Sequence, residues 1–311
     1  MGEKALYYKH WLKNLPIAFS YAVLHKNPKI SSFLGQKDMS LGRANEKIKE
    51  AILKGESYAA IRLGGMETSA LHGYEKIRLG LKKNYSDSVK YVMKHNAGFF
   101  PSDDEHLNQY GERLLPLLKE ADAFGVLGCF MESYLAKKYC PNADYLLYEG
   151  FEPLHGDWSM ALEGKKVLVI SPFVDEIKEQ YKQREKLFPK HKQLLPEFEL
   201  HVLRSPLTLG EEEGNLPTFF DELDAMYEKM RLEDFDVLLV GAGAYGTFLA
   251  LEAKRLGKIA IQTGGSTQTL FGIMGKRWEN REHVTQYCNQ YWIRPSSKPK
   301  GNEQVDGGAY W

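Results

Sequence analysis

The residues best suited to chemistry are an arginine and a glutamate that flank a pair of glycines. They lie in the segment IRLGGME (61–67), where an apolar run ends at the glycines and a helix begins. Arg62 can hold a phosphate through two parallel hydrogen bonds. Glu67 can hold a divalent cation, contact a sugar hydroxyl or accept a proton. We predict that Arg62, Gly64 and Gly65 bind a phosphorylated donor and that Glu67 is catalytic. The alternative is that Glu67 only stabilises the start of its helix.

A second glycine turn, GAGAYG (241–246), follows the apolar run Val237–Val240. A strand that feeds such a turn into a helix presents free backbone N–H groups at the positive end of the helix dipole. That geometry suits a phosphate or diphosphate, so Gly241, Gly243, Tyr245 and Gly246 are predicted to bind a nucleotide-type ligand. Alternatively, these glycines only allow the helix to pack closely on the strand.

The same turn matches the dinucleotide-binding pattern G-x-G-x-x-G. A dehydrogenase with this pattern has an acidic residue about 20 positions further on, which binds the ribose hydroxyls. Here that position falls in IQTG (261–264), which holds no carboxylate, and little chain remains for a complete dinucleotide fold. Nicotinamide chemistry is therefore a minor alternative.

A third cluster combines glycines, basic residues and aromatic residues near the C-terminus. Gly264, Gly265 and Ser266 form another turn after the apolar run Ile259–Gln262, and they are predicted to bind the donor. Lys276 and Arg277 are predicted to neutralise charge on a leaving diphosphate. We expect one of three rings, Trp278, Phe271 or Tyr245, to stack on a base or a sugar. The alternative for the basic cluster is a surface turn with a buried tryptophan.

The elements that position these residues alternate between strands and helices. Short, nearly continuous apolar runs predict buried strands, and longer runs with apolar residues at helical spacing predict helices. The predicted strands are Tyr58–Leu63, Phe124–Leu127, Tyr145–Glu149, Lys166–Ser171, Glu199–Arg204, Phe235–Val240 and Ile259–Gln262. The predicted helices include Asn45–Lys54, Glu105–Ala121, Val174–Phe188, Leu216–Met230 and Thr247–Leu256. This order predicts an α/β fold with a Rossmann-like, mostly parallel sheet covered on both faces.

The two strand–glycine–helix segments resemble those of the GT-D-type glycosyltransferases of bacterial surface-polysaccharide loci. That family has a Rossmann-like sheet, an early strand followed by R-[FL]-G-x-x-E, and a late strand–GAG–helix segment. The matching pieces are RLGGME (62–67) and VGAGAYG (240–246). A closer subgroup is similar along nearly the whole chain, through NAGFFP (96–101), KKVLVISPF (165–173), GGS…LFGI-x-GKRW (264–278) and GG-x-YW (307–311). The resemblance implies transfer of a sugar from a nucleoside diphosphate sugar.

One position departs from the family pattern. GT-D enzymes carry Asp-x-Glu after the first strand, a pair associated with the donor diphosphate and its metal. Gly65 takes the place of that aspartate here, and Glu67 alone remains. Asp157, in HGDW (155–158), is the predicted replacement catalytic carboxylate; the alternative is a loop residue that caps the following helical turn. The resemblance implies Mn²⁺ or Mg²⁺ held at Glu67 and no organic cofactor.

Composition excludes several other classes of protein. Lys+Arg and Asp+Glu both number 41 in 311 residues, so no net charge draws in nucleic acid. No apolar run is long enough to span a bilayer, and no signal-peptide pattern opens the chain. The three cysteines are widely spaced, which favours reduced thiols in a cytoplasmic protein.

The two ends of the chain differ from its middle. Residues 1–40 are predicted to form an aromatic and basic helical extension that rests on an anionic membrane or packs on the domain or a partner subunit. Residues 41–294 are predicted to be one Rossmann-like catalytic domain, and residues 295–311 a mobile tail. Tyr310 and Trp311 would be unusual in free solvent, so the aromatic ends are also candidate contacts of a homo-oligomer.

These observations predict a glycosyltransferase in the cytoplasm, at the inner face of the membrane. Its donor would be a nucleoside diphosphate sugar, with a UDP-sugar favoured, and its acceptor a polysaccharide, glycan or lipid-linked glycan. Two alternatives stay open: a different nucleotide-dependent transferase on the same scaffold, and a non-catalytic nucleotide-binding or assembly protein. The non-catalytic alternative is suggested by Gly65, which stands where the family has an acidic residue.

Overall fold

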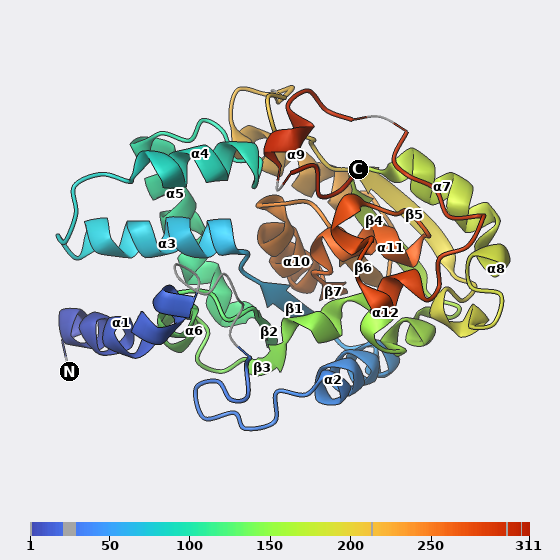
Figure 1. Ribbon diagram of the computed structural model, residues 1–311, viewed down its shortest axis with the longest axis horizontal. Helices are drawn as coiled ribbons and strands as arrows, with labels where there is room; N and C mark the ends of the chain where they lie inside the picture. The colour runs from blue at the N-terminus through green and yellow to red at the C-terminus, as the bar shows by residue number, and fades with distance from the viewer. Residues whose placement is uncertain (1, 21–28, 213, 297, 306) are drawn as a thin grey trace.

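The computed structural model describes residues 2–20, 29–212, 214–296, 298–305 and 307–311. These residues form a seven-stranded parallel sheet in the order β3-β2-β1-β7-β6-β4-β5 (Figure 1). The strands are β1 (Tyr58–Arg62), β2 (Ala123–Val126), β3 (Asp144–Leu147), β4 (Lys166–Ser171), β5 (Glu199–Arg204), β6 (Val237–Val240) and β7 (Ile259–Ile261). The predicted α/β class is confirmed.

Helices cover both faces of the sheet because successive strand residues point to opposite sides. Leu168 and Ile170 of β4 belong to one buried apolar cluster, and Val167 and Val169 belong to the other. The first cluster is completed by helices α3 (Gly65–Arg78), α4 (Asp87–His95), α5 (Asp104–Leu114), α6 (Glu132–Tyr139), α9 (Phe219–Arg231) and α10 (Tyr245–Arg255). The second is completed by α2 (Leu41–Lys54), α7 (Val174–Lys182), α8 (Arg184–Leu187), α11 (Thr267–Leu270) and α12 (Glu282–Thr285).

The chain changes faces between the adjacent strands β1 and β7. Helix α3 follows β1 into the first cluster, whereas α11 follows β7 into the second. Parallel strands whose following segments leave on opposite faces open a crevice at their carboxyl ends, which is where open α/β sheets bind ligands. This topology places both predicted glycine corners at one edge of the sheet.

Two predicted helices are each divided into two shorter elements. The segment 105–121 forms α5 and then a 3₁₀ turn (Leu115–Glu120), because Pro116 cannot donate a backbone N–H to the helix before it. The segment 174–188 forms α7 and α8, which are separated at Gln183 by a non-helical backbone. Neither break moves a predicted site residue.

The N-terminal extension contains helix α1 (Glu3–Phe19), which packs against α6 (Figure 1). Tyr7 is buried, and its hydroxyl is 2.8 Å from His72 Nε2 on α3. Tyr8, Leu12, Leu15 and Phe19, spaced along one side of α1, are exposed. No helix within the described ranges is long and apolar enough to cross a bilayer. Residues 1 and 21–28 of this predicted extension lie outside the described residues.

The C-terminal segment does not extend into solvent as the predicted tail would. Val305, Ala309 and Trp311 are buried, and the Trp311 carbonyl accepts a hydrogen bond from the Lys276 amide at 3.1 Å. The Ala309 carbonyl accepts another from the Arg277 amide at 3.0 Å. The last residues are therefore held against the turn η8 (Lys276–Trp278). Residues 297 and 306 lie outside the described residues.

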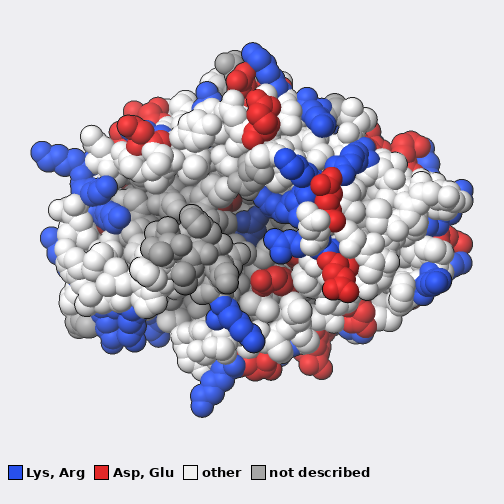
Figure 2. All heavy atoms as spheres, viewed as in Figure 1, with Lys and Arg blue, Asp and Glu red and all other residues white. Residues whose placement is uncertain are grey.

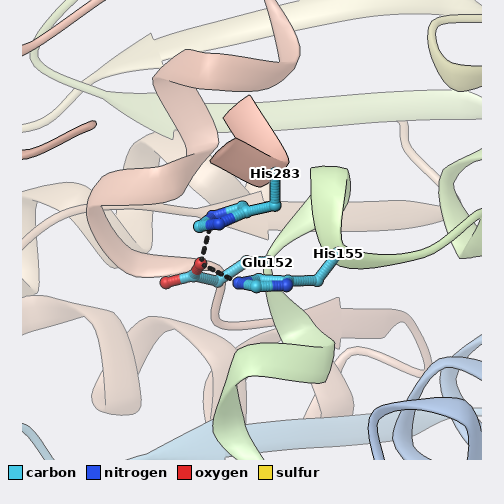
Figure 3. A group of neighbouring side chains, drawn as sticks. All are labelled: Glu152, His155 and His283. Atoms are coloured by element: carbon cyan, nitrogen blue, oxygen red, sulfur yellow. Dashed lines mark ion pairs between the residues drawn. The ribbon is translucent and has the colours of Figure 1, made fainter. Parts of the chain in front are cut away.

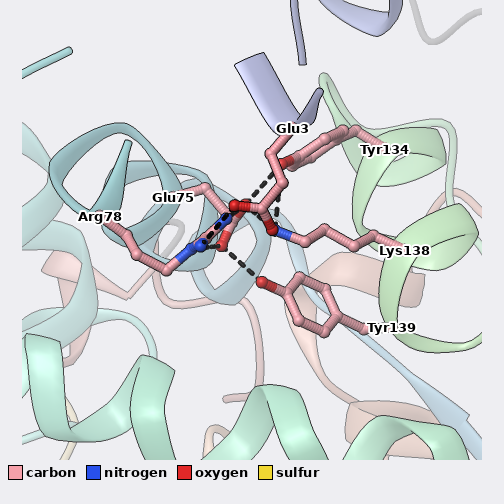
Figure 4. Close-up of polar contacts among 6 residues, drawn as sticks. All are labelled: Glu3, Glu75, Arg78, Tyr134, Lys138 and Tyr139. Atoms are coloured by element: carbon pink, nitrogen blue, oxygen red, sulfur yellow. Dashed lines mark hydrogen bonds and ion pairs between the residues drawn. The ribbon is translucent and has the colours of Figure 1, made fainter. Parts of the chain in front are cut away.

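A buried carboxylate on α3 is bound by side chains of α6, and the two cations that contact it also pair with Glu3 of α1 (Figure 4). Glu75 is fully buried and accepts hydrogen bonds from Lys138 at 2.7 Å, from Arg78 at 2.8 Å and from the hydroxyls of Tyr134 and Tyr139. Burial opposes ionisation of Glu75, but these donors outweigh it and lower its pKa to about 2. The carboxylate is therefore a fixed anion at the junction of three helices.

We expect Glu75→Ala to lower the free energy of unfolding by about 3 kcal/mol, because it removes the acceptor of two tyrosine hydroxyls and leaves Arg78 and Lys138 with Glu3 alone as their anionic partner. The pKa of Glu75 is depressed from 4.5, so its contribution is present above pH 4.5 and is lost as the pH falls towards 2. Urea unfolding of wild type and variant across this range measures the effect. The exposed Glu105→Ala is the control and should change stability by less than about 0.5 kcal/mol. Equal stability of Glu75→Ala and wild type at neutral pH would contradict the assignment.

Candidate active site

Two adjoining hollows open at the carboxyl edge of the sheet. The β6 hollow is lined from the ends of β1, β4, β5, β6 and β7. The β1 hollow is lined from the ends of β1, β2, β3 and β7. Residues shared by both are Arg62, Asn96, Ala97, Gly243, Gly265 and Tyr310. The two hollows therefore form one cleft, and Figure 2 shows this side of the molecule hollowed near its middle with basic side chains beside the opening.

Arg62 stands where the two hollows join. Its backbone N–H donates to Gln262 Oε1 at 2.9 Å and its carbonyl accepts from Thr247 Oγ1 at 3.0 Å, which fixes the end of β1. Its guanidinium carbon lies 5.4 Å from the centre of the Tyr148 ring. Burial raises the pKa of Tyr148 to about 12, so this phenol stays neutral at physiological pH. Arg62 Nε is shielded from solvent and has no hydrogen-bond partner in the described part of the chain. A cation held in this way is suited to receive an anion.

Glu67 lies in the first turn of α3, is 5 % exposed and lines the β1 hollow. A Cβ atom on Gly64 would lie 2.2 Å from Glu67 Oε2 and 2.4 Å from Arg62 Nη1. A side chain at this position would therefore have to displace the carboxylate or the guanidinium from its place over the backbone. The helix has no side-chain cap at Gly64, which leaves the amides of its first turn without a capping side chain, and residues of this turn line the β1 hollow.

The turn after β6 lines the cleft, but it does not leave the start of α10 open as the prediction of a diphosphate site requires. Gly241 and Gly243 line the β6 hollow. However, the Ala244 amide at the start of α10 donates to the Ala97 carbonyl at 3.0 Å, and a Cβ on Gly243 would lie 2.7 Å from that oxygen. The loop at Ala97 thus covers the start of α10, so this helix end is not an open diphosphate site as predicted.

Gly246 is a packing residue and does not line the cleft. A Cβ atom on it would lie 2.8 Å from Gln262 Nε2, so a larger residue would displace the Gln262 side chain between α10 and β7. Tyr245 lines the β6 hollow, but its ring is 2 % exposed and stacks on Phe219 with 4.1 Å between ring centres. Because Phe219 already covers this ring, Tyr245 cannot stack on a base or a sugar as predicted.

The turn after β7 forms the wall between the hollows. A Cβ on Gly264, whose φ is +59°, would lie 2.8 Å from both Arg62 Nη2 and the Tyr148 hydroxyl. A Cβ on Gly265 would lie 2.4 Å from the Tyr310 ring. Ser266 lines the β1 hollow, and its hydroxyl donates to the Thr263 carbonyl at 2.6 Å. Both glycines are thus required for the approach of cleft side chains.

The basic cluster is divided by the fold. Arg277 lines the β1 hollow, and its guanidinium carbon lies 4.8 Å from the centre of the Tyr310 ring. Lys276 does not line either hollow, because its Nζ donates to the Gly307 carbonyl at 2.9 Å. Its predicted contact with the diphosphate is therefore not supported. Phe271 is fully buried in the second apolar cluster, which removes it as a stacking residue.

Asp157 is separated from the cleft. Its carboxylate accepts from Asn45 Nδ2 at 2.7 Å and pairs with Lys49 Nζ at 3.0 Å, both on α2. It lines neither hollow and makes no side-chain cap for the turn η5 (Trp158–Leu162) that follows. The prediction of a replacement catalytic carboxylate at this position is wrong, because Asp157 serves to attach α2.

The metal implied at Glu67 does not fit the residues around it. Gly65 supplies no ligand, and within the described chain no His, Cys, Asp or Glu side chains gather with Glu67 into a set that could hold an ion. One carboxylate beside the Arg62 guanidinium is a poor cation site. Arg62 and Arg277 are the basic residues among those that line the β1 hollow.

Several cleft residues were not predicted as site residues. Tyr310 and Trp311 come from the C-terminal segment, Asn96 and Ala97 from the loop after α4, and Phe173 from the end of β4. Each lies in one of the segments that carry the family resemblance, NAGFFP, KKVLVISPF and GG-x-YW. The presence of these residues in the shared segments was the sequence signal that could have identified them as site residues. Of the three predicted stacking rings, Trp278 does line the β1 hollow, although its side chain is buried. Tyr310 borders both hollows.

A buried glutamate holds the loop after β2 at the rim. The Glu132 carboxylate accepts from the amides of Leu127 at 2.9 Å, Gly128 at 2.7 Å and Cys129 at 3.1 Å. Burial raises the pKa of Glu132 to about 7 in spite of these bonds. Leu127 borders the β1 hollow, so Glu132 positions one of its walls.

Comparison with known protein families, curated proteins and solved structures gives no significant match for this chain.

Proposed function

We propose that this protein is a glycosyltransferase that binds a nucleoside diphosphate sugar in the cleft. The observation that carries the proposal is the Arg62 guanidinium, held at the junction of two hollows with its Nε unsatisfied. A diphosphate is the anion expected there, because a nucleotide on one side and a sugar on the other would fill the two hollows. The position at the β1/β7 crossover of a parallel sheet agrees with this choice.

The ligand would lie with its nucleoside in the β6 hollow and its sugar in the β1 hollow. Arg62 and Arg277 would neutralise the diphosphate from two sides, helped by the first amides of α3. Tyr310 would lie against the base or the sugar. In the transfer step, the acceptor oxygen forms a bond to the anomeric carbon as the bond from that carbon to the diphosphate oxygen breaks. Glu67 would accept the hydroxyl proton or hold the transferred sugar.

The donor proposed first is a UDP-sugar, and the acceptor is a glycan or a lipid-linked glycan. A lipid-linked acceptor would bring the protein to the inner face of the membrane. A thermal-shift panel of UDP-, GDP- and CDP-sugars, with NAD and S-adenosylmethionine as comparisons, tests the donor class. A nucleoside diphosphate sugar at 100 times its Kd should stabilise the fold by about 2.7 kcal/mol. Stabilisation by NAD alone, or by no nucleotide, would refute the proposal.

Replacing Arg277 with alanine should weaken binding of the nucleoside diphosphate about tenfold, because an exposed cation at the rim contributes roughly 1–1.5 kcal/mol to a phosphate contact. Isothermal titration calorimetry of UDP against the full chain measures the change. The control is Arg281→Ala, an exposed arginine in the same segment that lines neither hollow. Identical affinities for wild type and Arg277→Ala would remove this residue from the phosphate site.

A further inference from the structure

A second polar cluster lies at the rim of the β1 hollow. It consists of Glu152, His155 and His283 (Figure 3). Glu152 immediately precedes the turn η4 (Pro153–His155), which ends at His155, and His283 belongs to α12. Glu152 also lines the β1 hollow. The fold thus joins two segments far apart in the sequence at one edge of the cleft.

The ligand atoms of this cluster converge on one point. His155 Nε2 lies 3.3 Å and His283 Nε2 3.5 Å from the same oxygen, Glu152 Oε2. The three ligand atoms lie within 4.8 Å of one another. In a tetrahedral site with bonds of about 2.0–2.1 Å, neighbouring ligand atoms are about 3.3–3.4 Å apart. The distances from Glu152 Oε2 to the two histidine nitrogens therefore already match the spacing between ligands in a tetrahedral site.

The cluster is incompletely satisfied without a cation. His283 Nε2 is shielded from solvent, and within the described residues its 3.5 Å contact with Glu152 Oε2 is an ion pair that lacks hydrogen-bond geometry. The two imidazole rings stack with 3.6 Å between their centres. A single cation between the two nitrogens and the carboxylate would satisfy all three groups at once.

We propose that Glu152, His155 and His283 form a binding site for a divalent transition-metal ion of the zinc class. Two imidazoles and one carboxylate suit Zn²⁺ better than Mg²⁺ or Ca²⁺, which prefer all-oxygen ligands. The three side chains are 17–23 % exposed, so a fourth position remains open to water or to a ligand in the β1 hollow. The site goes beyond the proposed sugar transfer and holds whether or not the cleft binds a nucleotide.

The test is a titration of metal into the full chain after chelator treatment, without nucleotide. We expect one equivalent of Zn²⁺ to bind by calorimetry, Co²⁺ to bind with a tetrahedral absorption spectrum, and Mg²⁺ to give no heat. His283→Ala should weaken Zn²⁺ binding by more than about 100-fold, since loss of an outer partner alone costs about 10–100-fold. Glu152→Gln, which keeps the shape of the side chain, should also weaken it.

The matched control is His201→Ala. His201 also lies between two carboxylates, Glu233 at 3.1 Å from Nδ1 and Glu199 at 2.9 Å from Nε2, but they face opposite ring nitrogens and cannot share one ion. It should bind Zn²⁺ as wild type does. Absence of Zn²⁺ binding by the wild type, or equal affinity of wild type and of folded His283→Ala and Glu152→Gln, would overturn the proposal. Circular dichroism confirms that each variant is folded.

Discussion

Arg62→Met is expected to lower the affinity for a nucleoside diphosphate about 100-fold without lowering the melting temperature of the free protein. A bidentate phosphate contact consists of two charge-assisted hydrogen bonds, and their joint loss costs about 3 kcal/mol. The free protein should tolerate the change because Arg62 Nε has no partner to lose among the described residues. Calorimetry with UDP, together with thermal unfolding of both proteins, measures the two effects separately.

The control for this prediction is Arg43→Met. Arg43 pairs with Asp144 at 2.9 Å on the far side of β3 and lines neither hollow. It should keep wild-type nucleotide affinity even where its melting temperature falls. Unchanged affinity in Arg62→Met would show that this guanidinium does not bind the ligand, and the proposed orientation of the donor would fail with it.

Glu67→Gln is expected to reduce turnover by about 10²–10⁴-fold, the range that a positioned acid–base group contributes. The amide keeps the size of the side chain but cannot accept a proton, so donor affinity should change little. Release of nucleoside diphosphate from the donor, with water standing in for the acceptor, gives the rate. Glu149→Gln is the control, because Glu149 is exposed and lies outside both hollows. Wild-type turnover in Glu67→Gln would exclude Glu67 from the chemistry.

The sheet was predictable because its signals are local. Runs such as KVLVIS at β4 and VLLV at β6 are apolar on both faces, which is the requirement of a strand covered by helices on each side. Glycines after β1, β6 and β7 marked where the chain turns. Since the carboxyl ends of parallel strands share one edge, the joint position of the glycine corners followed from the strand assignments.

The errors concern contacts between segments distant in sequence. Asp157 is held by Asn45, 112 positions away, and nothing beside Asp157 in the sequence signals that partner. The start of α10 is covered by the Ala97 carbonyl, which no side-chain pattern encodes. Local composition therefore indicated which residues could do chemistry but could not tell which of them face the cleft.

The C-terminal segment illustrates the same limit. Its polar composition predicted a mobile tail, yet burial of Trp311 and the hydrogen bond from the Lys276 amide outweigh that composition. This packing places Tyr310 at the junction of the hollows. It also brings the Gly307 carbonyl to Lys276 Nζ, which donates a hydrogen bond to it. One long-range contact thus added a cleft residue and removed another.

The most direct test is a crystal structure of the protein with the nucleoside diphosphate that stabilises it most in the thermal-shift panel. We predict that a phosphate oxygen lies within hydrogen-bond distance of the Arg62 guanidinium, with the β-phosphate directed towards Glu67 and the nucleoside in the β6 hollow. A diphosphate bound elsewhere on the molecule, with Arg62 still unpartnered, would contradict the account.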